Sequence, residues 1–420
     1  MLVSRVEKHI IRKSNKYYPM LDSFLVCSKN LYNHANYIIR QSFTKEGKYI
    51  SYNDMDKIMK EDKEYPDYDN MPTSQSAQQT LRLLNQNWQS FFSAIREYKK
   101  YPEKYKGRPK IPKYLNKNGR YELVLTNQYV KFWKSSRGKK ADDGKIHFPK
   151  SFNGFTLSTH IRELQGYRGL QQVRILPRYD YIELEVVYDV WIEDFIKGDN
   201  GRYLGVDIGV DNLVTITNNF GFQPIIVNGK GLKSINKYYN KQISHYREIA
   251  KKMNNSDYTH RMSSITLKRN NKIIDYMHKV SHDLIQLAQE QDVSAIVIGK
   301  NKEWKQNSKM SKKVNQTFVQ LPFVTLIKQI QYKAQNVGIT VICTEESYTS
   351  GTSFLDNESP VKENYNKSRR VHRGLFKSNT GKLINADVNG SLQIIKKVFP
   401  NAFGYGIEGV AVHPIVVNMA

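Results

Sequence analysis

The chain has 420 residues, of which 39% are hydrophobic, so it can form folded cores and has room for two or three domains. Its 65 Lys and Arg residues outnumber its 39 Asp and Glu residues, which gives a formal net charge of +26. Such an excess favours a polyanionic partner, and nucleic acid releases counterions when its phosphates are neutralised. No apolar run is long enough to cross a bilayer, and the N-terminus lacks the apolar segment of a signal peptide.

Cysteine usage narrows the protein class further. The chain has only two cysteines, Cys27 and Cys343, and each lies in an apolar stretch. This excludes a disulfide framework and a zinc site built from four cysteines of one chain. We therefore expect a protein of the reducing cytosol.

The first hundred residues predict one strand and two helices. Residues 1–12 alternate as in a short strand, and residues 18–43 carry apolar side chains at helical spacing. Residues 44–73 are polar and interrupted by prolines, so no element is predicted there. Residues 74–95 show a second helical face.

A basic stretch follows the second helix. Between residues 96 and 117, basic side chains outnumber Glu97 and Glu103, and prolines keep the stretch out of regular structure. We expect seven of these basic residues to contact phosphates: Lys99, Lys100, Lys104, Lys106, Arg108, Lys110 and Lys113. The loop 300–313 has a similar character, and Trp304 in it would stack on a base or anchor the loop.

The rest of the chain is predicted to be β-rich and then mixed. Residues 120–191 have strand character, with a hairpin around the Pro-Arg-Tyr-Asp turn, and residues 192–202 resemble a linker. Beyond the linker, strands and helices alternate. The predicted elements are two strands in 203–228, a helical region over 231–290, a strand at 293–299, a helix at 321–337, a strand from 338, a polar loop of roughly 35 residues, and a last helix beginning near Asp387.

Three carboxylates are candidates for divalent-metal chemistry. Asp207 lies in an otherwise apolar strand, where a carboxylate is costly unless it is paired or metal-bound. Asp387 stands at a helix start, where it could instead be a simple N-cap. The third acid would be Glu345 or Glu346 at a strand end. Adjacent strand residues face opposite sides, so only one of them can point at the metal, and we favour Glu346.

These segments together resemble the TnpB family, the transposon relatives of type V CRISPR effectors. GVDIGVDNLVTI, around Asp207, is similar to the family's first RuvC motif, and NADVNGSLQI, around Asp387, to its last. The helix from residue 77 and the KGRPKIPKY that follows it are similar to the family's helical recognition lobe and its Lys-rich exit. The shared order extends over most of the chain.

Two departures from the family pattern matter. The family usually places its second carboxylate at the end of the strand that matches VSAIVIG, where this chain has Gly299. It also usually carries paired CxxC motifs in the region that here reads GTSFLDNESP. The first departure indicates either a glutamate relocated to Glu345 or Glu346, which we favour, or a dead nuclease. The second indicates a zinc ribbon that is lost or rebuilt without metal.

The resemblance implies an α/β multidomain fold. A β-barrel-like wedge domain would comprise residues 1–15 and 111–198, and a helical recognition domain residues 16–110. An RNase H-like (RuvC) nuclease domain would occupy residues 199–420, with an insertion at 351–385 in place of the usual zinc ribbon.

The resemblance also implies an activity, partners and cofactors. We expect an RNA-guided, Mg²⁺-dependent DNA endonuclease of a transposable element, with Asp207, Glu346 and Asp387 holding two Mg²⁺ ions and no zinc. Its partners would be a guide RNA from the transposon end and double-stranded target DNA with a short adjacent motif. The alternatives are a nuclease-inactive RNA-guided DNA-binding repressor and a conventional transposase accessory protein.

Overall fold

The computed structural model describes two compact units, residues 1–192 and 193–420, and each is treated by itself. It describes the following residues: 1–136, 139–193, 196–254, 256, 258–300, 312–372, 374–404 and 412–419. The loop residue Trp304 therefore lies outside the described part of the chain. The division of the first unit into a wedge and a helical domain stays a prediction.

Three α-helices run through the first unit. They are α1 (Tyr18–Glu46), α2 (Tyr52–Glu61) and α3 (Ser74–Lys100). The predicted helices 18–43 and 74–95 are confirmed as α1 and α3, and the structure adds α2 inside the polar stretch. Helix α2 begins at a good cap, because the Ser51 hydroxyl accepts a hydrogen bond from the Asp54 N–H.

The strands of the first unit form two open sheets. The larger sheet is antiparallel in the order β1 (Leu2–Arg12), β7 (Tyr181–Trp191), β6 (Tyr167–Pro177), β2 (Leu123–Thr126). The smaller has the order β3 (Lys131–Ser136), β4 (Lys139–His147), β5 (Thr156–Ser158). The predicted hairpin is confirmed as β6–β7. Among the described residues no closed barrel forms, which corrects the barrel-like domain expected from the resemblance.

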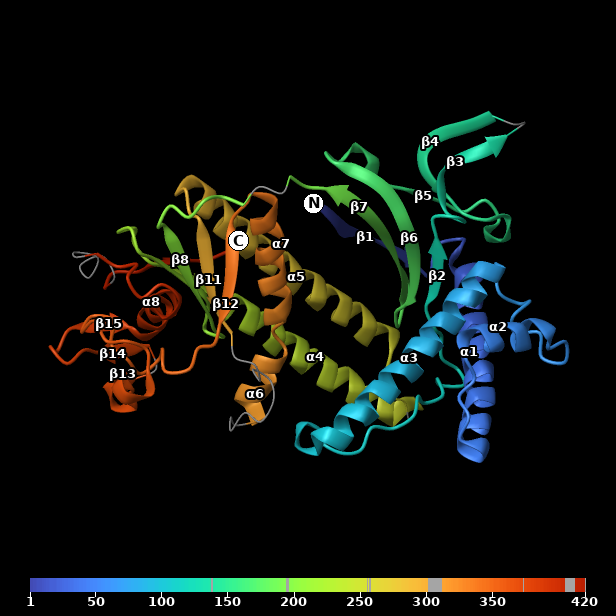
Figure 1. The fold of residues 1–420 in the computed structure, drawn as a ribbon, viewed down its shortest axis with the longest axis horizontal. Coiled ribbons are helices and arrows are strands. Elements are labelled where there is room, and N and C mark those ends of the chain that lie inside the picture. Colours follow the sequence, from blue (N-terminus) through green and yellow to red (C-terminus); the bar gives the residue numbers. More distant parts are fainter. Residues whose placement is uncertain are drawn as a thin grey trace. The chain divides into compact units, whose positions relative to one another are not determined.

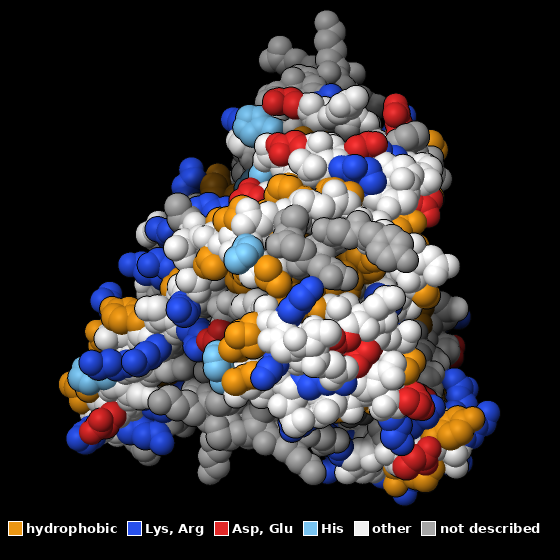
Figure 2. Space-filling view, turned by 90° about the vertical axis from the view of Figure 1, so that its left-hand side faces the viewer, with side chains coloured by type: hydrophobic (Ala, Val, Ile, Leu, Met, Phe, Trp, Pro, Cys, Tyr) orange, Lys and Arg blue, Asp and Glu red, His pale blue; other side chains and the backbone are white. Residues whose placement is uncertain are grey.

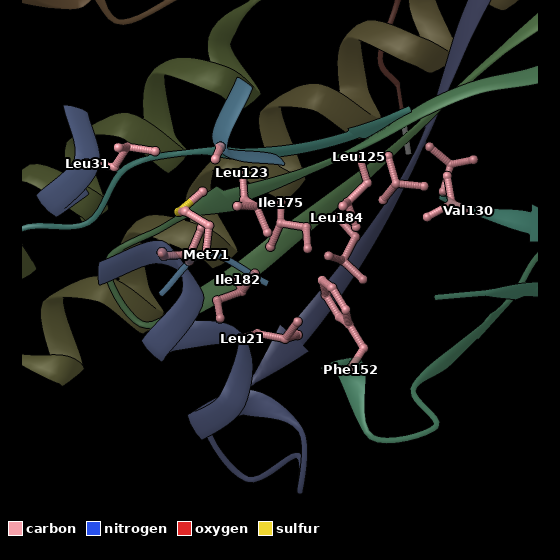
Figure 3. Packing of buried hydrophobic residues seen from close by; sticks show 14 of the residues in the cluster. Leu21, Leu31, Met71, Leu123, Leu125, Val130, Phe152, Ile175, Ile182 and Leu184 are labelled. Carbon is pink, nitrogen blue, oxygen red and sulfur yellow. The ribbon is translucent and has the colours of Figure 1, made fainter. Parts of the chain in front are cut away.

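One hydrophobic core joins the helices and the larger sheet of this unit. Figure 3 shows Leu123, Ile175 and Leu184, from three strands, pointing into the same interior as Leu21 of α1 and Phe152. Short 3-10 helices complete the connections: η1 (Pro102–Lys104), η2 (Lys150–Phe152) and η3 (Ile161–Glu163). Because the core is shared, the helices of this unit depend on its sheet for burial of their apolar faces.

The second unit contains a six-stranded mixed sheet. Its order is β12 (Thr340–Thr344), β11 (Ala295–Gly299), β8 (Tyr203–Ile208), β9 (Asn212–Asn218), β10 (Ile225–Asn228), β16 (Ile415–Val417). Strands β8, β11 and β12 are parallel, so their carboxyl ends meet at one edge. The predicted 203–228 region contains three strands rather than two, because β8 and β9 are separated by a tight turn.

Helices cover both faces of this sheet. They are α4 (Lys230–Asn254), α5 (His260–Glu290), α6 (Lys312–Val319), α7 (Phe323–Asn336) and α8 (Ala386–Val398). Figure 1 shows α5 and α7 on one side of β8, β11 and β12 and α8 on the other. The predicted basic helical region is therefore two helices, α4 and α5.

The segment 351–385 folds into a small module of its own. It contains η4 (Lys362–Asn364), η5 (Lys367–Arg369), β13 (Arg370–His372), β14 (Leu375–Lys377) and β15 (Leu383–Asn385). Strands β13, β14 and β15 pair as a three-stranded sheet. Its buried side chains Phe354, Leu355, Phe376 and Ile384 share one cluster with residues of β10 and α8 (Ile226, Ala386, Val388 and Leu392). The stretch predicted as a polar loop is thus partly a β module.

Charge is spread widely over the surface. Figure 2 shows Lys and Arg side chains along one edge of the displayed face, with acidic side chains scattered among them. Of the helices in the described ranges, none combines the length and apolarity that a membrane span requires.

Candidate active site

Asp207 lies near the carboxyl end of the central strand β8 and faces helix α8. Gly205, two residues earlier on the same face of the strand, allows the helix to approach closely, because a Cβ atom there would lie 2.5 Å from the Ser391 carbonyl oxygen. A Cβ atom at Gly390 of α8 would in turn lie 3.3 Å from Asp207 Oδ2. The strand therefore delivers the Asp207 carboxylate to the first turns of α8.

Asp387 lies in the first turn of α8, but it is not the N-cap. The cap is Asn385, whose side-chain oxygen accepts hydrogen bonds from the Asp387 and Val388 N–H groups at 2.9 and 3.2 Å. The capping alternative for Asp387 is therefore wrong. Its carboxylate is free to serve another role, and one of its oxygens, Oδ2, accepts a hydrogen bond from Asn212 Nδ2 at 2.7 Å.

Glu346, and not Glu345, lies over the neighbouring strand β11. Gly299 ends that strand and pairs with Thr344 of β12. A Cβ atom at position 299 would lie 2.7 Å from Glu346 Cγ and 2.8 Å from its Oε1. The Glu346 side chain thus occupies the space into which a side chain at position 299 would project, whereas Glu345 is exposed.

Electrostatics shows that the three carboxylates belong to one cluster, which we name the acidic cluster (Asp207, Glu346 and Asp387). Burial raises the pKa of Asp207 well above its usual range, and the charges of Glu346 and Asp387 raise it further. Arg370 acts in the opposite direction. Asp207 and Glu346 are half-buried residues and the Glu346 Oε1 atom is fully buried, whereas 33% of the Asp387 side chain is exposed, so Asp387 is the member of the cluster most open to solvent.

The acidic cluster is not an assembled coordination shell. Among the residues that the structure describes, no three His, Cys, Asp or Glu side chains stand close enough together to hold a metal ion as they are. The acids converge from three separate elements and influence one another's charge. A divalent ion would therefore have to draw their side chains together.

The predicted phosphate-binding residues are all exposed. This holds for Lys99, Lys100, Lys104, Lys106, Arg108, Lys110 and Lys113. Lys104 also interacts locally: its Nζ lies 3.6 Å from Glu97 Oε1 and 4.1 Å from the centre of the Tyr101 ring. The remaining cations of this stretch are available at the surface.

The sequence prediction missed how this stretch is held. Side chains of α1 donate hydrogen bonds to its backbone carbonyl groups: Lys29 Nζ to Lys117 at 2.7 Å, Asn33 Nδ2 to Leu115 at 3.0 Å, and Arg40 Nη1 to Pro112 at 2.8 Å. One side of α1 carries these three residues, because Lys29, Asn33 and Arg40 stand at positions i, i+4 and i+11. This polar stripe on a mainly apolar helix is the sequence signal that could have revealed their role.

Arg370 and Asn212 were also missed. Both contact Asp387, but they lie 158 residues apart in sequence (370 − 212), on β13 and β9. Asn212 stands beside the motif around Asp207 and could have been suspected from that neighbourhood. Arg370 lies in a polar stretch without any pattern that points to the acidic cluster.

Two protein families match separate parts of the second unit. The mixed sheet with acids gathered at the carboxyl ends of its parallel strands defines an α/β protein with a candidate carboxylate site. Within it, residues 197–305 match the family OrfB_IS605, described as "Probable transposase". Residues 323–394 match the family described as "Cas12f1-like, TNB domain". These two matches support a TnpB-like family for the chain.

Solved structures of type V effectors share low sequence identity with the chain. A Cas12f1–sgRNA–target DNA complex is 12% identical, covers 93% of this chain and 98% of its own, and has a TM-score of 0.37. A CRISPR–Cas12f ternary complex is 13% identical, with coverages of 89% and 80% and a TM-score of 0.37. A ternary complex of AacC2c1 with sgRNA and extended non-target DNA is 9% identical, with coverages of 86% and 64% and a TM-score of 0.39. No curated protein matches the chain.

Proposed function

We propose that the protein is an RNA-guided, metal-dependent DNA endonuclease of a transposable element. The observation that carries the proposal is the convergence of Asp207, Glu346 and Asp387 at the carboxyl end of the parallel strands. Three carboxylates gathered against their mutual repulsion need a compensating role, and holding divalent cations is such a role. The matches to the "Probable transposase" and "Cas12f1-like, TNB domain" families support the same proposal.

Mg²⁺ is the cation that suits these residues. It prefers carboxylate oxygens and keeps several waters, and the three carboxylates of the acidic cluster match the preference for oxygen ligands. We expect two ions, with Asp207, Glu346 and Asp387 holding them. When bound, the ions would activate water and stabilise the leaving oxygen of a phosphodiester.

The surrounding residues would orient these ligands. Asn212 donates to Oδ2 of Asp387 and so fixes that carboxylate in the first turn of α8, where the helix dipole also favours negative charge. The Thr349 hydroxyl donates to the Glu346 carbonyl oxygen at 2.8 Å and fixes the turn after β12. Gly299 leaves the space that the Glu346 side chain needs.

The partners would be a guide RNA made from the transposon end and double-stranded target DNA with a short adjacent motif. Exposed basic side chains between residues 99 and 113 and the net charge of +26 support binding of phosphate backbones. Two of the solved complexes cited above contain sgRNA by their titles, one with target DNA and the other with extended non-target DNA. The setting would be the prokaryotic cytosol, with the protein on the nucleoid when bound to DNA.

One alternative has an observation in its favour. Gly299 stands where the family usually has its second carboxylate, and no coordination shell is assembled among the described residues. Both facts are compatible with a nuclease-inactive RNA-guided DNA-binding repressor. Glu346 at the position over Gly299 is the reason that we favour the active enzyme.

The test is a purification followed by a cleavage assay. The protein is co-expressed with the DNA that flanks its coding sequence, and co-purifying RNA is sequenced. A plasmid library with a target matching that RNA and a randomised adjacent sequence is then incubated with Mg²⁺. We expect wild type to cut and Asp207→Ala to leave the plasmid intact.

The other outcomes separate the alternatives. Wild-type protein that carries RNA and binds the target without cutting it would identify the repressor. Protein that carries no defined RNA but binds the transposon ends would identify a conventional transposase accessory protein.

A further inference from the structure

Arg370 places a positive charge against the acidic cluster. Its Nη2 lies 3.8 Å from Asp387 Oδ1, on the opposite side of the carboxylate from Asn212, which binds Oδ2. The separation is longer than a hydrogen bond, and 36% of the Arg370 side chain is exposed to solvent. The contact is therefore an open ion pair that a competing cation can reach.

The neighbouring residue holds Arg370 in place. Arg369 Nη1 donates to Glu358 Oε2 at 2.6 Å, and these two side chains are only 15% and 14% exposed. The Ser353 N–H donates to the same Glu358 oxygen at 2.8 Å. Arg369 ends η5 and Arg370 begins β13, so this buried ion pair anchors the residue directly before Arg370 and fixes the point from which Arg370 reaches Asp387.

The position of Arg370 changes the charge balance of the acidic cluster. Asp207, Glu346 and Asp387 repel one another, and Arg370 opposes the effect of that repulsion on Asp207. A divalent cation bound by the same carboxylates would offset their repulsion more strongly than Arg370 does. Arg370 would repel that cation. Arginine and cation therefore compete for the same negative charge.

We propose that Arg370 is an exchangeable counter-ion of the acidic cluster, paired with Asp387 until a divalent cation binds and displaced when it does. This rests on the proposed function, because it needs the acidic cluster to be a cation site. The 351–385 module would then set the cation concentration at which the site becomes occupied.

The test measures Mn²⁺ binding to the full-length protein by titration calorimetry, which does not depend on cleavage. The variants are Arg370→Ala, Arg370→Lys and the control Lys377→Ala, which removes an exposed positive charge from strand β14 of the same sheet. We expect Arg370→Ala to bind Mn²⁺ about fivefold more tightly than wild type, the effect of losing a partly exposed ion pair. Arg370→Lys and Lys377→Ala should remain within about twofold of wild type.

Equal or weaker Mn²⁺ binding by a folded Arg370→Ala variant would overturn the proposal, as would equal tightening by Lys377→Ala. Far-ultraviolet circular dichroism checks folding, and Arg370→Gln provides a second neutral variant if the alanine variant unfolds. Asp207→Asn separates this proposal from the proposed function. If Asp207→Asn binds Mn²⁺ as wild type does, the cation site itself is wrong. If Asp207→Asn weakens binding and Arg370→Ala leaves it unchanged, only the counter-ion is wrong.

Discussion

At the scale of single residues, the Glu346 side chain, which follows β12, lies in space that Gly299 leaves open at the end of β11. The end of β11 offers room because it carries no side chain, and the residue two positions after β12 fills that room. A carboxylate can thus reach the edge of the sheet from a neighbouring strand. This geometry also distinguishes Glu346 from its exposed neighbour Glu345.

The two glutamates should respond differently to the same substitution. We expect Glu346→Gln to reduce the rate of Mg²⁺-dependent plasmid cleavage by at least about a hundredfold, because it removes one anionic ligand from the acidic cluster. Glu345→Gln is the matched control and should remain within about threefold of wild type, since its exposed side chain loses only a solvated charge. Equal losses for the two variants would contradict the assignment of Glu346.

A side chain at position 299 should displace Glu346. In Gly299→Ala the new Cβ atom would stand 2.6 Å from Ile394 Cδ1 and 2.7 Å from Glu346 Cγ, closer than two carbon atoms can pack, so both side chains must move. We expect cleavage to slow by about tenfold or more and the free energy of unfolding to fall by about 1 to 3 kcal/mol.

The control for that substitution is Gly198→Ala, where a Cβ atom meets no atom within 4 Å. Cleavage rates and urea unfolding of the two variants are compared with wild type. Cleavage by Gly299→Ala at the wild-type rate would show that Glu346 does not need this space.

At the scale of elements, the 351–385 module depends on buried polar contacts as well as on a small apolar core. Burial alone would raise the pKa of Glu358, but hydrogen bonds from Arg369 and the Ser353 N–H, with the charge of Arg369, outweigh burial and lower the pKa. A carboxylate whose folded-state pKa is lowered stabilises the fold above the pKa of the unfolded chain. That contribution is lost as the pH falls through the folded-state pKa.

The module should therefore show a pH-dependent response to Glu358→Gln. At pH 7 we expect the variant to lose about 1 to 3 kcal/mol of stability, because Arg369 loses its ionic partner. The difference from wild type should begin to shrink as the pH falls below the ordinary glutamate pKa of about 4.3 and continue to shrink as the pH falls through the lowered folded-state pKa of Glu358. Thermal unfolding at a series of pH values checks this, with the exposed Glu363→Gln as control. A difference independent of pH would contradict the ionic contribution.

At the scale of the whole molecule, the structure explains the placement of only part of the excess positive charge. The end of the basic stretch is the part that the structure explains best, because α1 holds the backbone of Pro112, Leu115 and Lys117 while the side chains of Lys113 and Lys117 stay exposed. A fixed backbone presents those charges with less entropy to lose on binding.

Removing charges from this stretch should change the salt dependence of nucleic-acid binding. Replacing Lys99, Lys100 and Lys106 together by Gln would remove three phosphate contacts. We expect the negative slope of log K against log salt to become less steep by about 2 to 3. Fluorescence anisotropy with a labelled RNA measures the slope. The control replaces the exposed lysines Lys45, Lys48 and Lys57 and should change the slope less. Equal changes would indicate that binding responds to total charge and not to this stretch.

Much of the local structure was predictable because it depends on short-range patterns. The apolar spacing of residues 18–43 and 74–95 reports helical faces, and the alternation on each side of the Pro-Arg-Tyr-Asp turn reports a hairpin. The patterns failed where they were weak, as in the polar stretch that contains α2 and in the 351–385 module. In both places short elements depend on contacts with residues outside the segment.

The sequence by itself determined the net charge, the order of most elements, the two aspartates in good motif context and the glutamate pair from which a third acid could come. Only the tertiary structure decided that Glu346 lies in the space over Gly299, that Asn212 binds Asp387, and that Arg370 faces the acidic cluster. The physical reason is range. Periodicity and capping act within a few residues, whereas these contacts join segments that meet only when the sheet and its covering helix have packed.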